Sequence, residues 1–99
     1  MSRRYYVYIL TNHTNAVLYT GVTRSIRWRI KQHRECTGSK FTARYNVTKL
    51  VYVEDYATPR EAILREKQIK AGSRARKLAL INSINPEWKD LYDEVCLLS

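Results

Sequence analysis

Five side chains of this sequence have the types and spacing for chemistry at a phosphate group. Tyr8 and Tyr19 stand in two short apolar segments, Arg29 and His33 lie one helical turn apart, and Glu66 follows in a later helical stripe. A forked guanidinium binds phosphate oxygens and stabilises the charge that develops in phosphoryl transfer. A carboxylate can hold a hard divalent cation. The set predicts a phosphate site, provided that the fold brings these segments together.

The two tyrosines also have a structural interpretation. Side chains alternate along a strand, so Tyr6, Tyr8 and Leu10 should share one face, and Tyr19 should share a face with Gly21 on the next strand. Cross-strand aromatic pairs stabilise hairpins without any catalytic role. Glycine weakens a strand interior, so Gly21 indicates a bulge or a close approach of a ligand to the backbone.

The segment after the second strand predicts a basic helix. Ile26 and Ile30 mark its inward face, and Arg29 and His33 lie on the flank of that face. A half-buried arginine needs an anionic partner, which is either a carboxylate of the protein or a phosphate. Other basic residues of the helix should point into solvent: Arg27, Lys31 and Arg34.

Glu66 occupies a position that the helical pattern expects to be buried. It shares a stripe with Ala62 and Ile69. A buried carboxylate needs a pairing cation or a metal ion. An ion pair with Arg29 and a Mg²⁺ ion held at a phosphate site both satisfy that need.

Further candidates lie outside this set. Lys40 and Arg44 belong to a basic connection and are predicted to contact phosphates, together with Arg27 and Lys31 of the helix. Trp28 points away from the Ile26 stripe, and it either stacks on a base or is covered by the C-terminal tail, which we favour. His13 is expected to be a solvated turn residue.

Composition points to a polyanionic partner. The 99-residue chain carries 18 Lys and Arg against nine Asp and Glu, a formal charge of +9. Such a field favours nucleic acid, with an anionic membrane surface or a ribosome-like environment as the alternative. The sequence has no run of eighteen apolar residues, so no membrane span is predicted. The start of the chain has no secretory pattern and the two cysteines form no CxxC or metal-finger spacing, so we expect a cytoplasmic protein.

The elements that must position these residues form one α+β domain over residues 1–99. Its core is expected at about 5–83 and its tail at 84–99. Aromatic and β-branched runs predict strands over 5–10, 17–22 and 49–56, and the third, apolar on both faces, suits a middle strand. Capping residues predict three helices, which begin after Ser25, Thr58 and Ser73, the first ending near Glu35, the second at Gly72 and the third at Asn85-Pro86.

The ordered set of motifs resembles the GIY-YIG nuclease superfamily, in particular its small single-domain bacterial members. Tyr6-Val7-Tyr8 stands where that family has GIY, and Tyr19-Thr20-Gly21 where it has YIG. Arg29 matches the family's arginine, His33 a position often held by a functional histidine, and Glu66 the metal-binding glutamate of the helix "REAILREKQIK".

The resemblance implies a three-stranded antiparallel sheet flanked by helices and a DNA endonuclease that uses Mg²⁺ or Mn²⁺. Tyr8 or Tyr19 would activate or position the attacking water, and nearby positive charge would lower the tyrosine pKa. Arg29 would stabilise the phosphate, His33 would handle a proton or contact the phosphate, and Glu66 would hold the metal.

Substrates would be damaged or branched DNA in repair, recombination or restriction, recognised by structure more than by sequence, with a partner protein supplying specificity. A non-catalytic nucleic-acid-binding module on the same scaffold is the alternative, and a basic protein adaptor is the third interpretation.

Overall fold

The sheet begins with the antiparallel hairpin that the sequence predicts. In this computed structural model, which describes residues 4–35 and 44–96, β1 spans Tyr5–Thr11 and β2 spans Leu18–Thr23. The turn between them is held by Asn12, whose side-chain oxygen accepts hydrogen bonds from the backbone N–H groups of Ala16 and Val17. A short polar turn therefore fixes the register of the two strands that carry the tyrosines.

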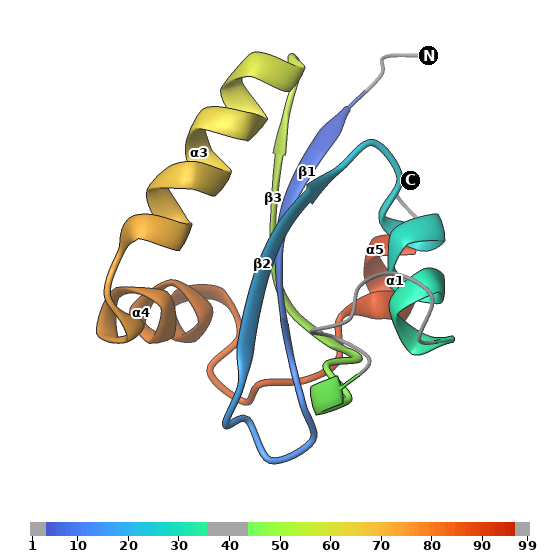
Figure 1. Cartoon of the computed structure of the whole chain (residues 1–99), viewed down its shortest axis with the longest axis vertical. Coiled ribbons are helices and arrows are strands. Elements are labelled where there is room, and N and C mark those ends of the chain that lie inside the picture. The colour runs from blue at the N-terminus through green and yellow to red at the C-terminus, as the bar shows by residue number, and fades with distance from the viewer. Residues whose placement is uncertain (1–3, 36–43, 97–99) are drawn as a thin grey trace.

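β3, over Lys49–Tyr56, completes a three-stranded sheet in the order β2-β1-β3 (Figure 1). The expectation that the third strand lies in the middle is wrong, because β1 pairs with both of its neighbours. Leu50 and Val51, which point to opposite faces, are nevertheless both buried. A strand that is apolar on both faces is covered by helices on both sides of the sheet. This pattern does not indicate whether the strand lies in the middle of the sheet or at its edge.

Each long helix begins at the residue that the sequence predicts. The side chain of Ser25 caps α1 (Ile26–Arg34), that of Thr58 caps α3 (Pro59–Ala71) and that of Ser73 caps α4 (Arg74–Ile84). Gly72 ends α3 as expected, but its φ of −74° is not the left-handed conformation of a typical glycine cap. The chain thus passes from α3 into α4 with only two residues between them.

Helices cover both faces of the sheet. α1 and the short helix α5 (Tyr92–Cys96) lie on one side, and α3 and α4 lie on the other (Figure 1). Alternate residues of β1 point to opposite faces of the sheet, and on each face they belong to a hydrophobic cluster. Tyr6, Tyr8 and Leu10 pack with Ile26 and Ile30 of α1, as the alternation predicts.

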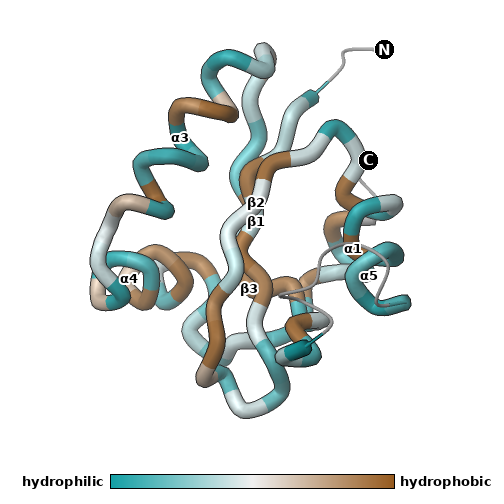
Figure 2. Tube along the Cα trace, in the orientation of Figure 1, coloured by the Kyte–Doolittle hydropathy of each residue, from teal (hydrophilic) through white to brown (hydrophobic). Residues whose placement is uncertain are grey.

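The second cluster lies under α3 and α4. It contains Val7 and Ile9 of β1 together with Ala62, Ile69 and Ile81 of the two helices. Hydrophobic residues follow the strands, whereas much of α1 and α3 is hydrophilic (Figure 2). Among the described helices, none is long and apolar enough to cross a membrane.

The C-terminal tail packs on α1, but it does not cover Trp28. Leu91 donates a backbone hydrogen bond to Leu50, and the Tyr92 hydroxyl donates one to the carbonyl oxygen of Arg27. Trp28 remains 59% exposed, so the preference for a Trp28 covered by the tail is wrong. The tail contacts a different flank of α1. The hydrophobic pattern of the tail does not specify which flank of the helix it covers.

Candidate functional site

Tyr8 stands at the centre of the site, in the middle of the central strand. In the antiparallel pairing of β1 with β2, Tyr8 lies opposite Gly21. A Cβ atom at Gly21 would lie 2.4 Å from the Tyr8 hydroxyl oxygen, so only glycine leaves room for the ring. The close approach that Gly21 predicts is therefore made by a tyrosine of the protein itself, over the neighbouring strand.

Tyr8, Tyr19 and His33 form an aromatic group between the hairpin and α1. The His33 ring centroid lies 5.3 Å from that of Tyr19, in an edge arrangement, and 6.0 Å from that of Tyr8. The two tyrosine rings are 6.4 Å apart. Tyr8 and His33 are buried, whereas Tyr19 is only partly buried. The structure thus brings together three residues that the sequence selected.

Burial controls the protonation of this group. It raises the pKa of Tyr8, and the neighbouring Tyr19 adds to this effect, while the charge of Arg29 and its hydrogen bond to Tyr8 oppose it. The expectation that basic surroundings lower this pKa is wrong for Tyr8, because desolvation outweighs the single arginine. Burial, and then the charge of Arg29, lower the pKa of His33 to about 4.

Both groups are consequently neutral at pH 7. The Tyr8 hydroxyl oxygen lies 3.2 Å from Nε2 of His33. A tyrosine hydroxyl and a neutral imidazole nitrogen form a hydrogen bond at this distance, and the tautomer of His33 sets which of the two atoms donates. The pair is a buried, uncharged hydrogen bond between the middle of β1 and the last turn of α1.

One hydrogen-bond donor of Arg29 has no acceptor among the described residues. Arg29 lies half-buried on the flank of α1, as predicted, and the donor is its buried Nε. Leaving a buried charged donor unsatisfied is costly, and such groups in native structures call for an explanation. An anionic oxygen beside Arg29 would satisfy this donor.

Glu66 reaches the site from the other side of the sheet. α3 packs against β1 and β2, with Ala62 and Ile69 buried along the same stripe. The Glu66 side chain is 13% exposed and pairs with Lys70 at 3.0 Å, and not with Arg29. Burial and then Tyr19 are the larger causes of the raised pKa of Tyr8, and the charge of Glu66 adds to them.

The donor set suits a magnesium ion better than a metal with an all-protein cage. Within residues 4–35 and 44–96, no group of three His, Cys, Asp or Glu side chains could hold a metal. Mg²⁺ commonly takes one or two carboxylates and completes its shell with water and substrate phosphates. A single largely buried carboxylate beside an unfilled arginine fits that mode.

The other predicted nucleic-acid contacts lie at the surface. Arg27 and Lys31 are exposed on α1, and Arg44 is exposed with its guanidinium 5.4 Å from the Tyr45 ring. Lys40 lies outside the described residues. His13 is exposed in the hairpin turn, as expected.

Sequence reasoning missed a second polar cluster, built on Glu54. Its carboxylate accepts hydrogen bonds from Tyr52 and Tyr56 of the same strand and a two-pronged contact from Arg65 of α3. Burial alone would raise the pKa of Glu54, but these hydrogen bonds outweigh burial and lower it. The signal was the alternation of positions 52, 54 and 56, which places all three on one face. Arg65 directly precedes Glu66, so this cluster anchors the helix that carries the proposed ligand.

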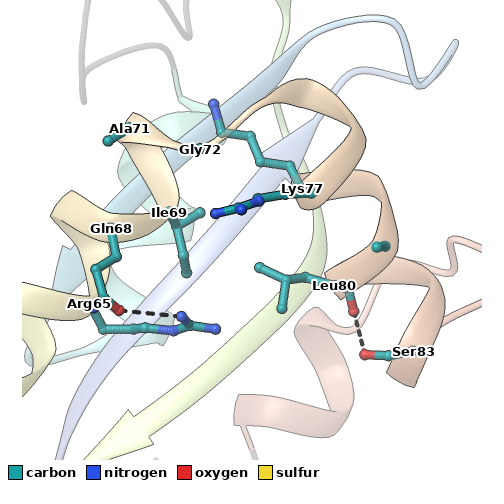
Figure 3. A pocket seen from close by; sticks show the side chains of 10 residues that line it. Arg65, Gln68, Ile69, Ala71, Gly72, Lys77, Leu80 and Ser83 are labelled. Atoms are coloured by element: carbon teal, nitrogen blue, oxygen red, sulfur yellow. Dashed lines mark hydrogen bonds between the residues drawn. The ribbon is translucent and has the colours of Figure 1, made fainter.

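A groove on the opposite face of the sheet is separate from this site. This groove of about 700 Å³ lies between α3 and α4, floored by Ile69 and Leu80 and flanked by Arg76 and Lys77 (Figure 3). None of the five predicted site residues lines it. The candidate site is instead a surface around β2, with α1 on one side and α3 on the other (Figure 1).

Comparisons with known proteins match this geometry. The family model for the GIY-YIG catalytic domain matches residues 4–79. A UPF0213 protein of Clostridium perfringens is 45% identical over 92 residues, which are 93% of this chain and 98% of that protein. A UPF0213 protein of Staphylococcus haemolyticus is 40% identical over 78 residues, covering 79% and 94% of the two chains.

This chain is also similar to a solved structure. The solution structure of a UPF0213 protein from Bacillus halodurans is 33% identical and aligns with a TM-score of 0.52, over 83% of this chain and 85% of that one. The predicted α+β fold, with a three-stranded antiparallel sheet and flanking helices, is confirmed.

Proposed function

Because the chain belongs to the GIY-YIG catalytic domain family, we propose that it is a magnesium-dependent endonuclease that hydrolyses phosphodiester bonds in DNA. One observation carries this proposal. Tyr8, Tyr19 and His33 pack together, and the charges of Arg29 and Glu66 both act on Tyr8. The charge of +9 adds a general attraction for a polyanion.

Arg29 is proposed to bind the phosphate that is cleaved. Its buried Nε has no acceptor, so a phosphate oxygen would fill a position that the protein leaves open. A guanidinium can contact two phosphate oxygens at once and follow the charge that develops on them. Removing a comparable preorganised donor from an enzyme lowers the rate by about 10²–10³-fold.

Glu66 is proposed to hold the magnesium ion, with water and phosphate oxygens as the other ligands. When bound there, the ion would supply Lewis-acid stabilisation of the phosphate charge. Lys70, which is exposed and pairs with Glu66, keeps the carboxylate compensated before the ion binds.

Exposure divides the two tyrosines between different roles. Tyr8 is 0% exposed and its hydroxyl contacts Nε2 of His33, so we assign it the task of fixing the imidazole and the strand. Tyr19 is only partly buried and packs on the same imidazole. Tyr19 is therefore the tyrosine that we propose to contact the attacking water.

The proposal is tested by cleavage of labelled single-stranded, duplex and branched DNA with Mg²⁺. We expect the wild type to cleave and Glu66→Ala to lose cleavage by at least about 10²-fold while it remains folded by circular dichroism. The matched control is Glu61→Ala, which removes a carboxylate from the same helix at its exposed cap. This control should keep cleavage near the wild-type rate.

Two outcomes contradict the proposal. Full cleavage by Glu66→Ala would remove the metal role of that residue. No cleavage by the wild type, together with binding that weakens steeply with salt, would support a non-catalytic binding module instead.

A further inference from the structure

Trp28 is the most exposed large hydrophobic residue described on this side of the molecule. Its side chain is 59% exposed on the outer face of α1, opposite the buried Ile26 and Ile30. Its backbone N–H is used by the cap at Ser25, but the indole ring packs into neither hydrophobic cluster. A tryptophan left in water by its own fold suggests a binding role.

The surroundings of Trp28 are basic. Arg27 and Lys31 of the same helix are exposed, Lys31 lies 4.0 Å from Glu35, and α1 has no acidic residue in its first turn. In the described part of the tail, Tyr92 packs elsewhere on α1, with its ring centroid 4.3 Å from the Arg34 guanidinium and its hydroxyl bonded to the carbonyl oxygen of Arg27. An aromatic ring among cations matches a strand with flat bases and a charged backbone.

Trp28 lies next to a residue of the proposed site in the sequence of α1. Arg29 follows it directly and turns toward Tyr8, so the indole and the guanidinium occupy neighbouring rows on one helix. A strand whose phosphate reaches Arg29 would bring an adjacent nucleotide over the surface of α1. Base-paired nucleotides are stacked inside a duplex, and only unpaired ones can turn out to meet an exposed indole.

We propose that Trp28 stacks on an unpaired base next to the bound phosphate, so that the protein selects single-stranded or locally opened nucleic acid. This proposal rests on the function proposed above and narrows its substrate class. The ring stacks on any base, so it gives preference for structure and not for sequence. Substrates with gaps, mismatches or branch points present such bases.

The first experiment compares Trp28→Ala and Trp28→Phe with the wild type. Dissociation constants for a labelled single strand and for the corresponding duplex are measured in EDTA, so that no cleavage occurs. We expect Trp28→Ala to weaken single-strand binding by about 5- to 100-fold and Trp28→Phe to recover most of it. Duplex binding should change less than about twofold, because no charge is altered.

Leu64→Ala provides the matched control. Leu64 is 58% exposed on α3, so its removal tests loss of an exposed apolar side chain away from α1. This control should bind both DNAs as the wild type does. Equal losses on single strand and duplex in Trp28→Ala, or no loss on either, would overturn the proposal and leave a protein partner as the occupant of this surface.

Fluorescence gives an independent measurement. The other tryptophan, Trp88, donates its indole N–H to Asn82 and packs against the cluster under α3 and α4. Saturable quenching by a single strand that is present in the wild type and absent in Trp28→Phe would therefore locate stacking at Trp28. Quenching that persists in Trp28→Phe would contradict it.

The two proposals fail in different ways. A wild type that stacks a single strand on Trp28 but never cleaves DNA would overturn the nuclease and keep the binding mode. A protein that cleaves in a Glu66-dependent manner but binds equally well without Trp28 would overturn only the stacking.

Discussion

The Tyr8 hydroxyl lies 3.2 Å from Nε2 of His33, and both side chains are buried. This contact joins the central strand to α1 and holds the strand and the helix that frame the proposed phosphate site. Protonation of His33 would turn both ring nitrogens into donors and place a positive charge in this buried contact. The pH at which the imidazole gains a proton therefore bears on both stability and site geometry.

We expect acid to destabilise the protein through His33. The pKa of His33 is about 4 in the folded protein against about 6.5 when it is free, so between these values the unfolded chain binds the extra proton. Stability should fall as pH drops from about 6.5 to about 4 and then level off, by up to about 3 kcal/mol. Urea unfolding at a series of pH values measures this loss.

The matched variant for that series is His33→Gln, whose amide can accept the Tyr8 hydrogen bond but does not titrate. Its stability should decline less than that of the wild type over the same pH range. Parallel pH profiles for the two proteins would show that His33 does not cause the loss.

Gly21→Ala is expected to destabilise the fold by about 1–3 kcal/mol, since the new methyl group would press on the Tyr8 ring. Gly72→Ala is the control. Gly72 has a φ of −74°, and the nearest atom to a new Cβ is 3.4 Å away, so this substitution should change stability by less than about 1 kcal/mol. The measurement is the free energy of unfolding in urea, and equal effects at both glycines would contradict the role of Gly21.

Removing the Glu54 carboxylate should loosen α3. Glu54→Ala leaves Arg65 and two tyrosine hydroxyls without their acceptor, and the Glu54 side chain is only 17% exposed, so we expect a cost of about 3–5 kcal/mol. Asp55→Ala removes the next carboxylate of the strand, whose partner Arg4 is exposed, and should cost less than about 1 kcal/mol. Thermal unfolding compares the two variants, and similar costs would show that the Glu54 cluster does not anchor the helix.

The sequence by itself determined the local structure, and it supplied the residues of the proposed site. Ser25, Thr58 and Ser73 cap their helices because a cap depends on a hydroxyl and the N–H groups two or three residues later, which are close in sequence. The alternation of Tyr6, Tyr8 and Leu10 is likewise a property of one strand. These features need no knowledge of distant contacts.

Only the tertiary structure decided the strand order, the exposure of Trp28, the partner of Glu66 and the protonation of Tyr8. Each of these properties depends on which side chains are covered by segments that are distant in the sequence. β3 is apolar on both faces yet lies at an edge, and the tail packs on α1 without reaching Trp28. The sequence is rich in basic residues, but the pKa of Tyr8 rises because packing removes water from its side chain. Desolvation is set by the whole fold, and no local pattern of residues records it.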